Sequence, residues 1–384
     1  GSRLQLAVDN GGTLQNISTK VNGGVVGGLL AFRSEVLDGA RRDLGQLAVG
    51  LADAFNAQHR QGMDLQGNLG TDFFTTAVPL TSAASTNTGT AVVTAVLADA
   101  SGLAGRDYEV RFDGTAWSVR DGQTGAVVPA SGAGTAADPL VFAGLSVSAA
   151  GTAAAGDRFL VRPLVNATNG FGVALSTPAE IAAAAPLVSR VDAGNDSQAT
   201  VGAPTVTDIT DPKLRTTATI FFDTPNSYYV YTGSGLDAIG PLPYTSGADI
   251  SFAGWTTQVS GQVQTGDRFY VAAAAAGSGD NRNVLALATV AQQGFFAGGT
   301  QSISDLGADI VATVGATANR ASNEIKVQQA LREQAEIDLQ NVSGVNLDEE
   351  AANMLKYQQA YLAASKVIGV ADGLFQNLLQ IVGR

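Results

Sequence analysis

The last stretch of the chain, residues 344–384, constrains the fold more than any other part of the sequence. Its apolar side chains recur every seven residues, at Leu347, Met354, Tyr361, Ile368, Phe375 and Val382, and a second set widens this line at Ala351, Leu355, Leu362, Ala371, Leu374 and Leu378. A seven-residue repeat stays on one face of a helix only when a partner helix coils around it. The stretch therefore predicts a coiled-coil helix, about 55 Å long at 1.5 Å per residue.

Polar residues mark the start of this helix. Asn346 can cap the first turn, and Glu349 can reach back to the backbone N–H of the cap. Asp348, Glu349 and Glu350 place negative charge where the helix dipole favours it. We therefore expect the helix to begin at Asn346, after a break at Gly344.

Three further helices are predicted. Residues 28–60 carry leucines at seven-residue spacing, interrupted by glycines that each weaken a helix by roughly 1 kcal/mol relative to alanine. Residues 280–293 form the second helix. A capping box at Ser302–Asp305 opens the third, which runs to about residue 341. We interpret the apolar faces of 28–60 and 302–340 as internal core, and the face of the final helix as the contact for a partner.

The remaining segments near the N-terminus are short. Alternating residues around Asn10-Gly11 predict a β-hairpin, with strands near 4–8 and 14–18. Residues 78–90 are rich in serine, threonine and alanine and are interpreted as a linker.

The middle of the chain contains an internal repeat with an offset of 110 residues. Asp138–Leu145 resembles Ala248–Trp255, and Gly156–Val161 resembles Gly266–Val271. Short alternating runs bounded by glycine are typical of strands. We therefore predict two copies of one small β module, about 92–165 and 202–275.

Two expectations follow from this repeat. Phe142 should correspond to Phe252 and Phe159 to Phe269, with both pairs buried in matching strands. Between the copies, residues 178–185 predict a short helix that starts at Pro178.

Composition limits the chemistry available to the chain. A net charge of −12 argues against a nucleic-acid partner. The sequence has no cysteine, and its single histidine cannot build a common zinc site. No phosphate-binding loop or nucleophile elbow is present. We therefore expect no enzyme activity, no catalytic or metal-binding residue and no cofactor.

Three features have both a functional and a structural interpretation, and the structural one is favoured each time. His59 is interpreted as a packing or capping residue, with its charge near a helix end. The repeated Asp157-Arg158 and Asp267-Arg268 pairs are interpreted as a turn and salt bridge before the last strand. Six aromatic residues of the β modules either line a sugar-binding face or fill a core, and the core is favoured: Trp117, Trp255, Tyr228, Tyr229, Tyr231 and Tyr244.

Signals for membrane insertion or general secretion are absent from the sequence. It contains no run of 18 apolar residues, which a transmembrane helix needs. Its first residues lack the basic region and apolar core of a signal peptide.

Three motifs carry a resemblance to a known family. Ser343–Tyr361 resembles the C-terminal signature of the flagellar axial proteins, which include rod, hook and hook-associated proteins. Gly27–Arg33, Leu47-Ala48, Ala54–Gly67 and Gly70–Phe74 resemble the hook-associated protein 1 family, whose members join hook and filament, and the run Phe55 to Gly67 favours this family. Gly279–Ala288 resembles the same family where the chain re-enters its helical domain. Hook-associated protein 3 is a less favoured alternative.

The resemblance implies a structural protein of the bacterial flagellum, an adaptor at the hook–filament junction that assembles through its helical terminal domains. It implies three kinds of partner: hook protein and hook-associated protein 3, further copies of the chain, and a flagellar export chaperone. It also implies an extracellular location reached through the flagellar type III pathway, and a partner helix preceding residue 1. The alternative is a secreted adhesin or carbohydrate-binding protein that uses the β modules.

The fold class expected is α+β and multidomain: a discontinuous bundle of long helices, two inserted all-β modules and a C-terminal coiled-coil helix. The expected domains are a helical bundle with an N-terminal hairpin (1–89 with 277–343), β module 1 (90–165), a connector (166–201), β module 2 (202–276) and the axial helix (344–384). The expected assembly and chaperone interface comprises Leu347, Met354, Leu355, Tyr361, Leu362, Ile368, Phe375, Leu378 and Val382.

Overall fold

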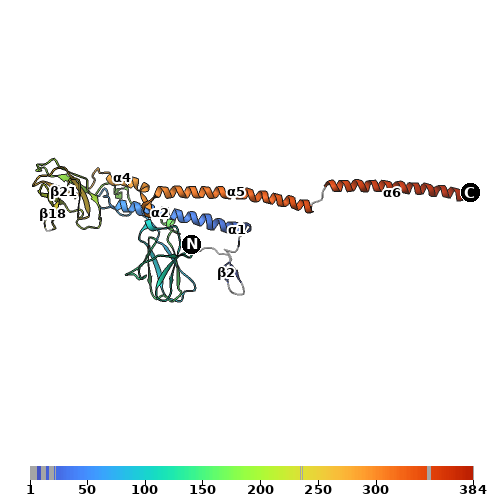
Figure 1. Ribbon diagram of the computed structural model, residues 1–384, viewed down its shortest axis with the longest axis horizontal. Helices are drawn as coiled ribbons and strands as arrows, with labels where there is room; N and C mark the ends of the chain where they lie inside the picture. The colour runs from blue at the N-terminus through green and yellow to red at the C-terminus, as the bar shows by residue number, and fades with distance from the viewer. Residues whose placement is uncertain are drawn as a thin grey trace. The chain divides into compact units, whose positions relative to one another are not determined.

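The computed structural model describes residues 7–9, 14–16, 21, 23–233, 235, 237–343 and 347–383 (Figure 1). The chain divides into two compact units, Gly1–Val314 and Gly315–Arg384. The fold is α+β, with a helix near the N-terminus, antiparallel sheets and long helices toward the C-terminus. This agrees with the fold class expected at its coarsest level.

The N-terminal hairpin consists of β1 (Ala7–Asp9) and β2 (Leu14–Asn16), which pair antiparallel with Ala7 opposite Asn16. The predicted pair of strands is therefore confirmed. The Asn10-Gly11 turn and the outer ends of both predicted strands lie outside the described residues.

The first long helix is continuous but not uniform. It comprises α1 (Gly24–Ala31), a π-helical segment η1 (Phe32–Leu37) and α2 (Asp38–Arg60). The predicted helix over 28–60 is thus present and begins four residues earlier.

The helix buries only the later part of the predicted leucine line, since Leu47 and Leu51 pack against the cluster of Val290, Phe296 and Ile303. Leu37 and Leu44 are exposed, whereas Val49 and Ala52 are buried. Gly45 allows the backbone of Leu164 to approach α2 closely, because a Cβ atom at position 45 would stand 2.8 Å from the carbonyl oxygen of Leu164. Gly45 and Gly50 therefore mark a side of the helix on which other segments approach closely, whereas a side chain at Gly39 would meet open space.

Module 1 is a sandwich of two antiparallel sheets. One sheet has the strand order β4-β11-β6-β7-β8 and the other has β5-β10-β9. The strands are β4 (Leu80–Ala83), β5 (Val92–Leu97), β6 (Tyr108–Phe112), β7 (Trp117–Asp121), β8 (Val127–Val128), β9 (Leu140–Phe142), β10 (Leu145–Ala150) and β11 (Arg158–Arg162). Side chains from both sheets meet in one core that includes Val110, Leu145, Val147, Phe159 and Val161.

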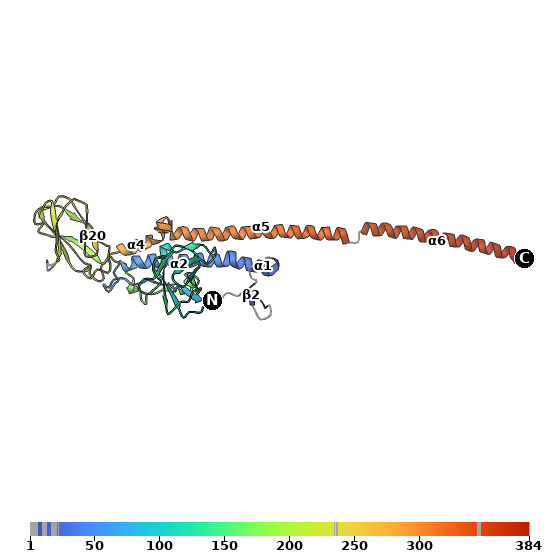
Figure 2. The same cartoon turned by 60° about the horizontal axis from the view of Figure 1, so that its bottom comes forward.

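Module 2 repeats this arrangement, except that two short strands, β14 and β15, pair with β20 where the single strand β5 pairs with β10. Its sheets have the orders β13-β21-β16-β17-β18 and β14-β20-β15, with β19 also paired to β20. The strands are β13 (Leu187–Val191), β14 (Thr200–Val201), β15 (Thr205–Val206), β16 (Ala218–Thr224), β17 (Ser227–Thr232), β18 (Ile239–Pro243), β19 (Asp249–Phe252), β20 (Trp255–Ser260) and β21 (Arg268–Ala273). In Figure 2 the module lies at the left, where β20 is labelled.

Details of the repeat hold at the level of single residues. Ala143 and Ala253 both adopt a left-handed conformation, with φ of 45° and 42°, in the turn before the matching strands β10 and β20. Phe142, Phe159 and Phe269 are buried as predicted, whereas Phe252 is only half-buried.

The first strand of each module lies in a segment that was predicted from the sequence to be a linker or a connector. Strand β4 pairs with β11, so residues 80–83 of the predicted linker belong to a sheet. Strand β13 pairs with β21 within the segment expected to connect the modules. Both are edge strands, and their hydrogen bonds to a central strand depend little on side-chain pattern.

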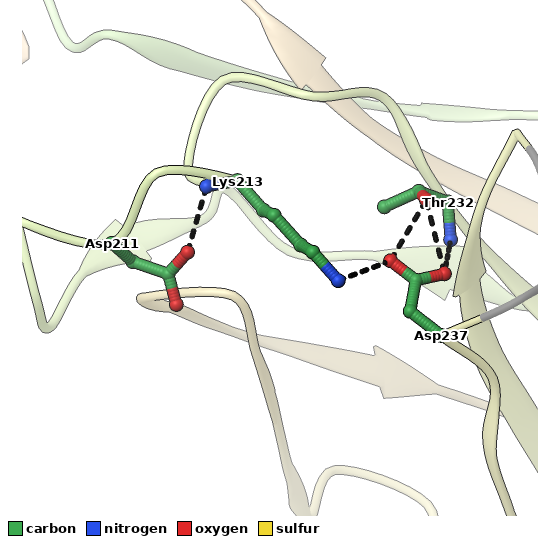
Figure 3. Close-up of polar contacts among 4 residues, drawn as sticks. All are labelled: Asp211, Lys213, Thr232 and Asp237. Carbon is green, nitrogen blue, oxygen red and sulfur yellow. Dashed lines mark hydrogen bonds and ion pairs between the residues drawn. The ribbon is translucent and has the colours of Figure 1, made fainter.

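Polar side chains connect two loops of module 2 (Figure 3). Asp237 accepts hydrogen bonds from the backbone N–H and hydroxyl of Thr232 and pairs with the Lys213 ammonium at 2.9 Å. Asp211 accepts the backbone N–H of Lys213. The segment after β17 is thereby tied to the loop before β16.

The connecting segments carry little regular structure. Strand β3 (Phe74–Thr75) pairs with β12 (Gly172–Val173), and α3 (Ala167–Gly170) is a single turn. The short helix predicted over 178–185 is only a 3₁₀ turn, η3 (Pro178–Glu180). The remainder is extended, because Ala184 exchanges backbone hydrogen bonds with Met63.

The C-terminal part begins with α4 (Arg282–Thr289) and the 3₁₀ turns and hairpin η4 (Val290–Gln292), β22 (Gly294–Phe296), η5 (Ala297–Gly299) and β23 (Gln301–Ser302). The predicted capping box is confirmed, since Ser302 and Asp305 exchange backbone-to-side-chain hydrogen bonds at 3.0 Å. It opens α5 (Ile303–Ser343). Helix α6 (Leu347–Val382) follows, while Gly344 and the predicted cap Asn346 lie outside the described residues.

Candidate assembly surfaces

His59 joins two loops to the end of α2. Its ring is fully buried, Nδ1 lies 2.6 Å from the carbonyl oxygen of Thr71, and Nε2 accepts the backbone N–H of Ala182 at 2.9 Å. This pattern assigns the ring proton to Nδ1, which donates to Thr71. The packing interpretation is therefore right, but His59 acts by hydrogen bonding and not through charge at a helix end.

The repeated aspartates organise turns without an ion pair to the adjacent arginines. Asp157 accepts hydrogen bonds from the backbone N–H groups of Thr88, Gly89 and Ala154. Asp267 accepts those of Asp196 and Gln264 in the same way. The backbone hydrogen bonds to Asp157, of which the one from Ala154 has the largest effect, hold the pKa of Asp157 below its ordinary value. The turn interpretation is correct, and the salt bridge is replaced by backbone donors.

The six aromatic residues considered for sugar binding divide between core and surface. Trp255 is fully buried and Tyr228 nearly so, while Tyr244 donates its hydroxyl to the carbonyl oxygen of Gly261. Trp117, Tyr229 and Tyr231 are half-buried on strands of different modules. They do not form one shared face. Among the described residues, no group of three or more acidic, histidine or cysteine side chains is placed to hold a metal.

The long helices present apolar side chains that are not covered by the described part of the chain. On the first long helix these include Leu29 in α1, Phe32 and Leu37 in η1, and Leu44 in α2. On α5, Ile303 and Ile310 are buried, but the predicted stripe is exposed beyond them, at Val314, Ile325, Leu331 and Leu339. The interpretation of 302–340 as internal core therefore holds only in its first two turns.

Every predicted interface residue on α6 is exposed. The exposed fraction ranges from 58% at Leu355 to 81% at Leu347. All nine residues lie on one helix, so the structure brings them together as a continuous element. Exposed apolar side chains of this extent are typical of a surface that contacts another protein.

These side chains do not form a single stripe. At 3.6 residues per turn, Leu355 and Leu378 point in directions about 140° apart around α6. Near the C-terminal end the apolar face widens to roughly half of the circumference, because further apolar residues flank the predicted line. Four exposed residues outside the predicted interface contribute to this widening, and their spacing in the sequence would have indicated it: Val367, Val370, Leu379 and Ile381. One coiled-coil partner cannot cover such a face.

Family comparisons match three regions of the chain. Residues 1–74 match the family described as flagellar hook-associated protein FlgK helical domain. Residues 82–163 match the flagellar hook-associated protein 1, D2-like domain, and residues 340–381 match the flagellar basal body rod FlgEFG protein C-terminal family.

Relatives extend the similarity across most of the chain. Flagellar hook-associated protein 1 of Salmonella typhimurium is 31% identical over 362 residues, which cover 94% of this chain and 50% of the relative. The protein of the same name from Escherichia coli K12 is 27% identical over 99% of this chain and 54% of its own length. The chain thus spans about half the length of these relatives.

A solved structure supports the fold. The flagellar hook junction protein FlgK from Burkholderia pseudomallei superposes with a TM-score of 0.74 and 28% identity, over 86% of this chain and 65% of that protein. In the part of the chain that the structure describes, no helix combines the length and apolarity needed to cross a bilayer.

Proposed function

Because the chain belongs to the family of flagellar hook-associated protein 1, we propose that it is a structural component of the bacterial flagellum that joins hook and filament. The observation that carries this proposal is the match of both the first helical segment and β module 1 to this family. The adhesin alternative gains no support from the relatives described, which are flagellar proteins.

The mechanism proposed is assembly through helices. The exposed apolar side chains of α1, α2, α5 and α6 become buried when several subunits pack their helices side by side. Burying each large side chain contributes about 1.5–3 kcal/mol, so a few dozen such residues supply ample driving force for a permanent junction. In this arrangement the helical segments form the discontinuous bundle, and the two β modules extend from it.

The two-sided apolar face of α6 sets the number of neighbours. Leu355 and Leu362 lie to one side of the heptad line, and Leu378 lies to the other. We expect α6 to be enclosed by at least two helices, one of which belongs to the chain preceding residue 1 or to another copy. Copies of the chain, hook protein and hook-associated protein 3 are the proposed neighbours.

The proposed route to this position is the flagellar export pathway. An exposed apolar helix is prone to non-specific association before assembly. A chaperone that covers Met354, Tyr361 and their neighbours would prevent this association in the cell. The absence of cysteine agrees with a chain that crosses an export channel unfolded.

The test is a double substitution on α6, introduced into the complete protein in its own bacterium. Met354→Asp with Tyr361→Asp places two charges on the apolar line. We expect loss of chaperone co-purification and loss of junctions, so that hooks carry no filament in electron micrographs.

A matched control uses the same spacing one position earlier. Asn353→Asp with Ala360→Asp adds the same charges to the polar side of α6, and both positions are exposed. This variant should assemble as the unsubstituted protein does. Normal filaments in the Met354 and Tyr361 variant would refute the proposed role of this face.

A further inference from the structure

A groove of about 310 Å³ lies between the first long helix and β module 1. The views of Figures 1 and 2 agree in placing this module beside α2. The charged residues that line the groove are Arg33, Asp38, Arg41, Arg42, Asp107 and Arg162. Four guanidinium groups against two carboxylates leave an excess of positive charge, on a chain whose net charge is −12.

The helix is irregular where it borders this groove. The π-helical segment η1 spans Phe32–Leu37, and both Arg33 and Leu37 line the groove. π-helical turns are rare, and those that occur are frequently found at functional sites. The irregularity therefore coincides with the basic surface.

Arg162 is an arginine that the β module itself does not need. Its Nε atom is buried and has no hydrogen-bond partner within the described part of the chain. At the offset of the repeat, module 2 has Ala272 at this position and folds with the same strand order. A buried donor without an acceptor is costly, and an acceptor supplied by a ligand removes that cost.

We propose that this groove binds the acidic first turn of α6 from a second copy of the chain. Asp348, Glu349 and Glu350 are the only three consecutive acidic residues in the sequence, and all three are exposed. Carboxylates and guanidinium groups form charge-assisted, often bidentate hydrogen bonds. The proposal rests on the proposed function, since it requires that copies pack side by side.

The binding mode follows from the charges and the length of the acidic run. Adjacent residues on a helix point about 100° apart, so three consecutive carboxylates can meet groups on both walls of a groove. Arg41 is contributed by the helix wall, and Arg162 by the module wall. The contact would fix the position of α6 of one subunit along its axis relative to the first long helix and β module 1 of its neighbour.

Disulfide trapping tests this contact directly, because the chain has no cysteine of its own. Leu37→Cys is placed in the groove of one chain, and Ala351→Cys follows the acidic turn of another. Neither substitution removes a charged group. The two proteins are mixed at high concentration and low ionic strength under mild oxidation. We expect a disulfide-linked heterodimer.

The control moves the second cysteine along the same helix. Ala364→Cys lies roughly 20 Å farther along α6 at 1.5 Å per residue and is exposed as Ala351 is. We expect at least about fivefold less heterodimer with it, because a disulfide needs Cα atoms within about 7 Å. Adding Glu349→Lys and Glu350→Lys, or Arg41→Ala and Arg162→Ala, should reduce the Ala351→Cys product to the level of this control.

Each contrary outcome has a distinct meaning. Equal yields from Ala351→Cys and Ala364→Cys, or no heterodimer at all, would overturn the proposal. A disulfide formed only within a chain that carries both Leu37→Cys and Ala351→Cys would assign the groove to the chain's own α6. If Arg41→Ala with Arg162→Ala assembles normally in the flagellum while Met354→Asp with Tyr361→Asp does not, this contact is wrong and the proposed function stands.

Discussion

Gly50 on α2 lies directly against the ring of Phe296. A Cβ atom at Gly50 would stand 2.1 Å from Cζ of Phe296, which is far inside van der Waals contact. Phe296 is itself buried, in a cluster with Val290 and Ile303. The start of α5 is therefore attached to α2 at a position where only glycine fits.

The first prediction contrasts this glycine with one that touches nothing. Gly50→Ala should destabilise the chain by about 1–3 kcal/mol, because a buried ring must move to admit the methyl group. Gly39→Ala should instead stabilise the chain by up to about 1 kcal/mol. A Cβ atom at position 39 would have no neighbouring side chain or other segment within 4 Å, and alanine favours the helix. Urea denaturation of both variants, followed by circular dichroism, measures the two effects. Equal signs would contradict the packing described here.

The second prediction uses the matched asparagines of the two modules. Asn87 donates its amide to the carbonyl oxygen of Arg158 and accepts the backbone N–H of the same residue. Asn195 makes the same two bonds with Arg268. Asn87→Ala and Asn195→Ala should each cost about 1–3 kcal/mol, because two backbone groups lose their partner. Hydrogen exchange should show faster exchange confined to the module that carries the substitution.

The third prediction concerns acid. The backbone N–H of Thr124 and the Arg106 guanidinium hold the pKa of Asp121 well below its ordinary value. A carboxylate with a lowered folded-state pKa stabilises the fold above its unfolded pKa, about 3.9, and that stability is lost as pH falls through the lowered value. The stability gap between the unsubstituted chain and Asp121→Asn should be widest above about pH 5, should narrow below about pH 4 and should close only as pH falls through the lowered folded-state pKa. Urea midpoints across this range measure the gap.

The fourth prediction concerns the isolated chain. Beyond residue 314, the described side chains of α5 and α6 are exposed apart from Thr317, which is half-buried, and isolated helices are marginal in water. Their amides should exchange within seconds to minutes, whereas those of residues 45–59, packed against module 1 and α4, should be protected for far longer. Strong protection along α6 in a monomer would show that its apolar face is already covered.

Local sequence signals predicted much of this fold because they depend on neighbouring residues. The Ser302–Asp305 capping box opens α5 as expected, and the repeat of 110 residues identified both modules. The buried face of α2 was predicted only in part: Leu47 and Leu51 pack against a core cluster as expected, but the close contacts at Gly45 and Gly50 were missed because periodicity weighs leucine and ignores glycine. Strand β4 was missed because its residues, Leu80–Ala83, carry only a weak strand pattern and pair with a strand about 80 residues away.

The candidate site was predicted in part for the same reason. The heptad line on α6 follows from spacing alone, and its side chains are exposed in the structure. The widening of the apolar face toward Ile381 requires counting every apolar residue around the helix and not only those in one register. The basic groove beside Arg162 brings together residues more than 100 positions apart, and no local pattern in the sequence indicates it.

In each module the strand that enters and the strand that leaves are hydrogen-bonded neighbours: β4 lies next to β11, and β13 lies next to β21. The chain thus returns to nearly the point from which it departed. A segment with this property can be gained, lost or copied in evolution without altering the spacing of the segments on either side. The tandem presence of two such modules is what a single gene-duplication event would leave, and the helices need no redesign to accommodate it.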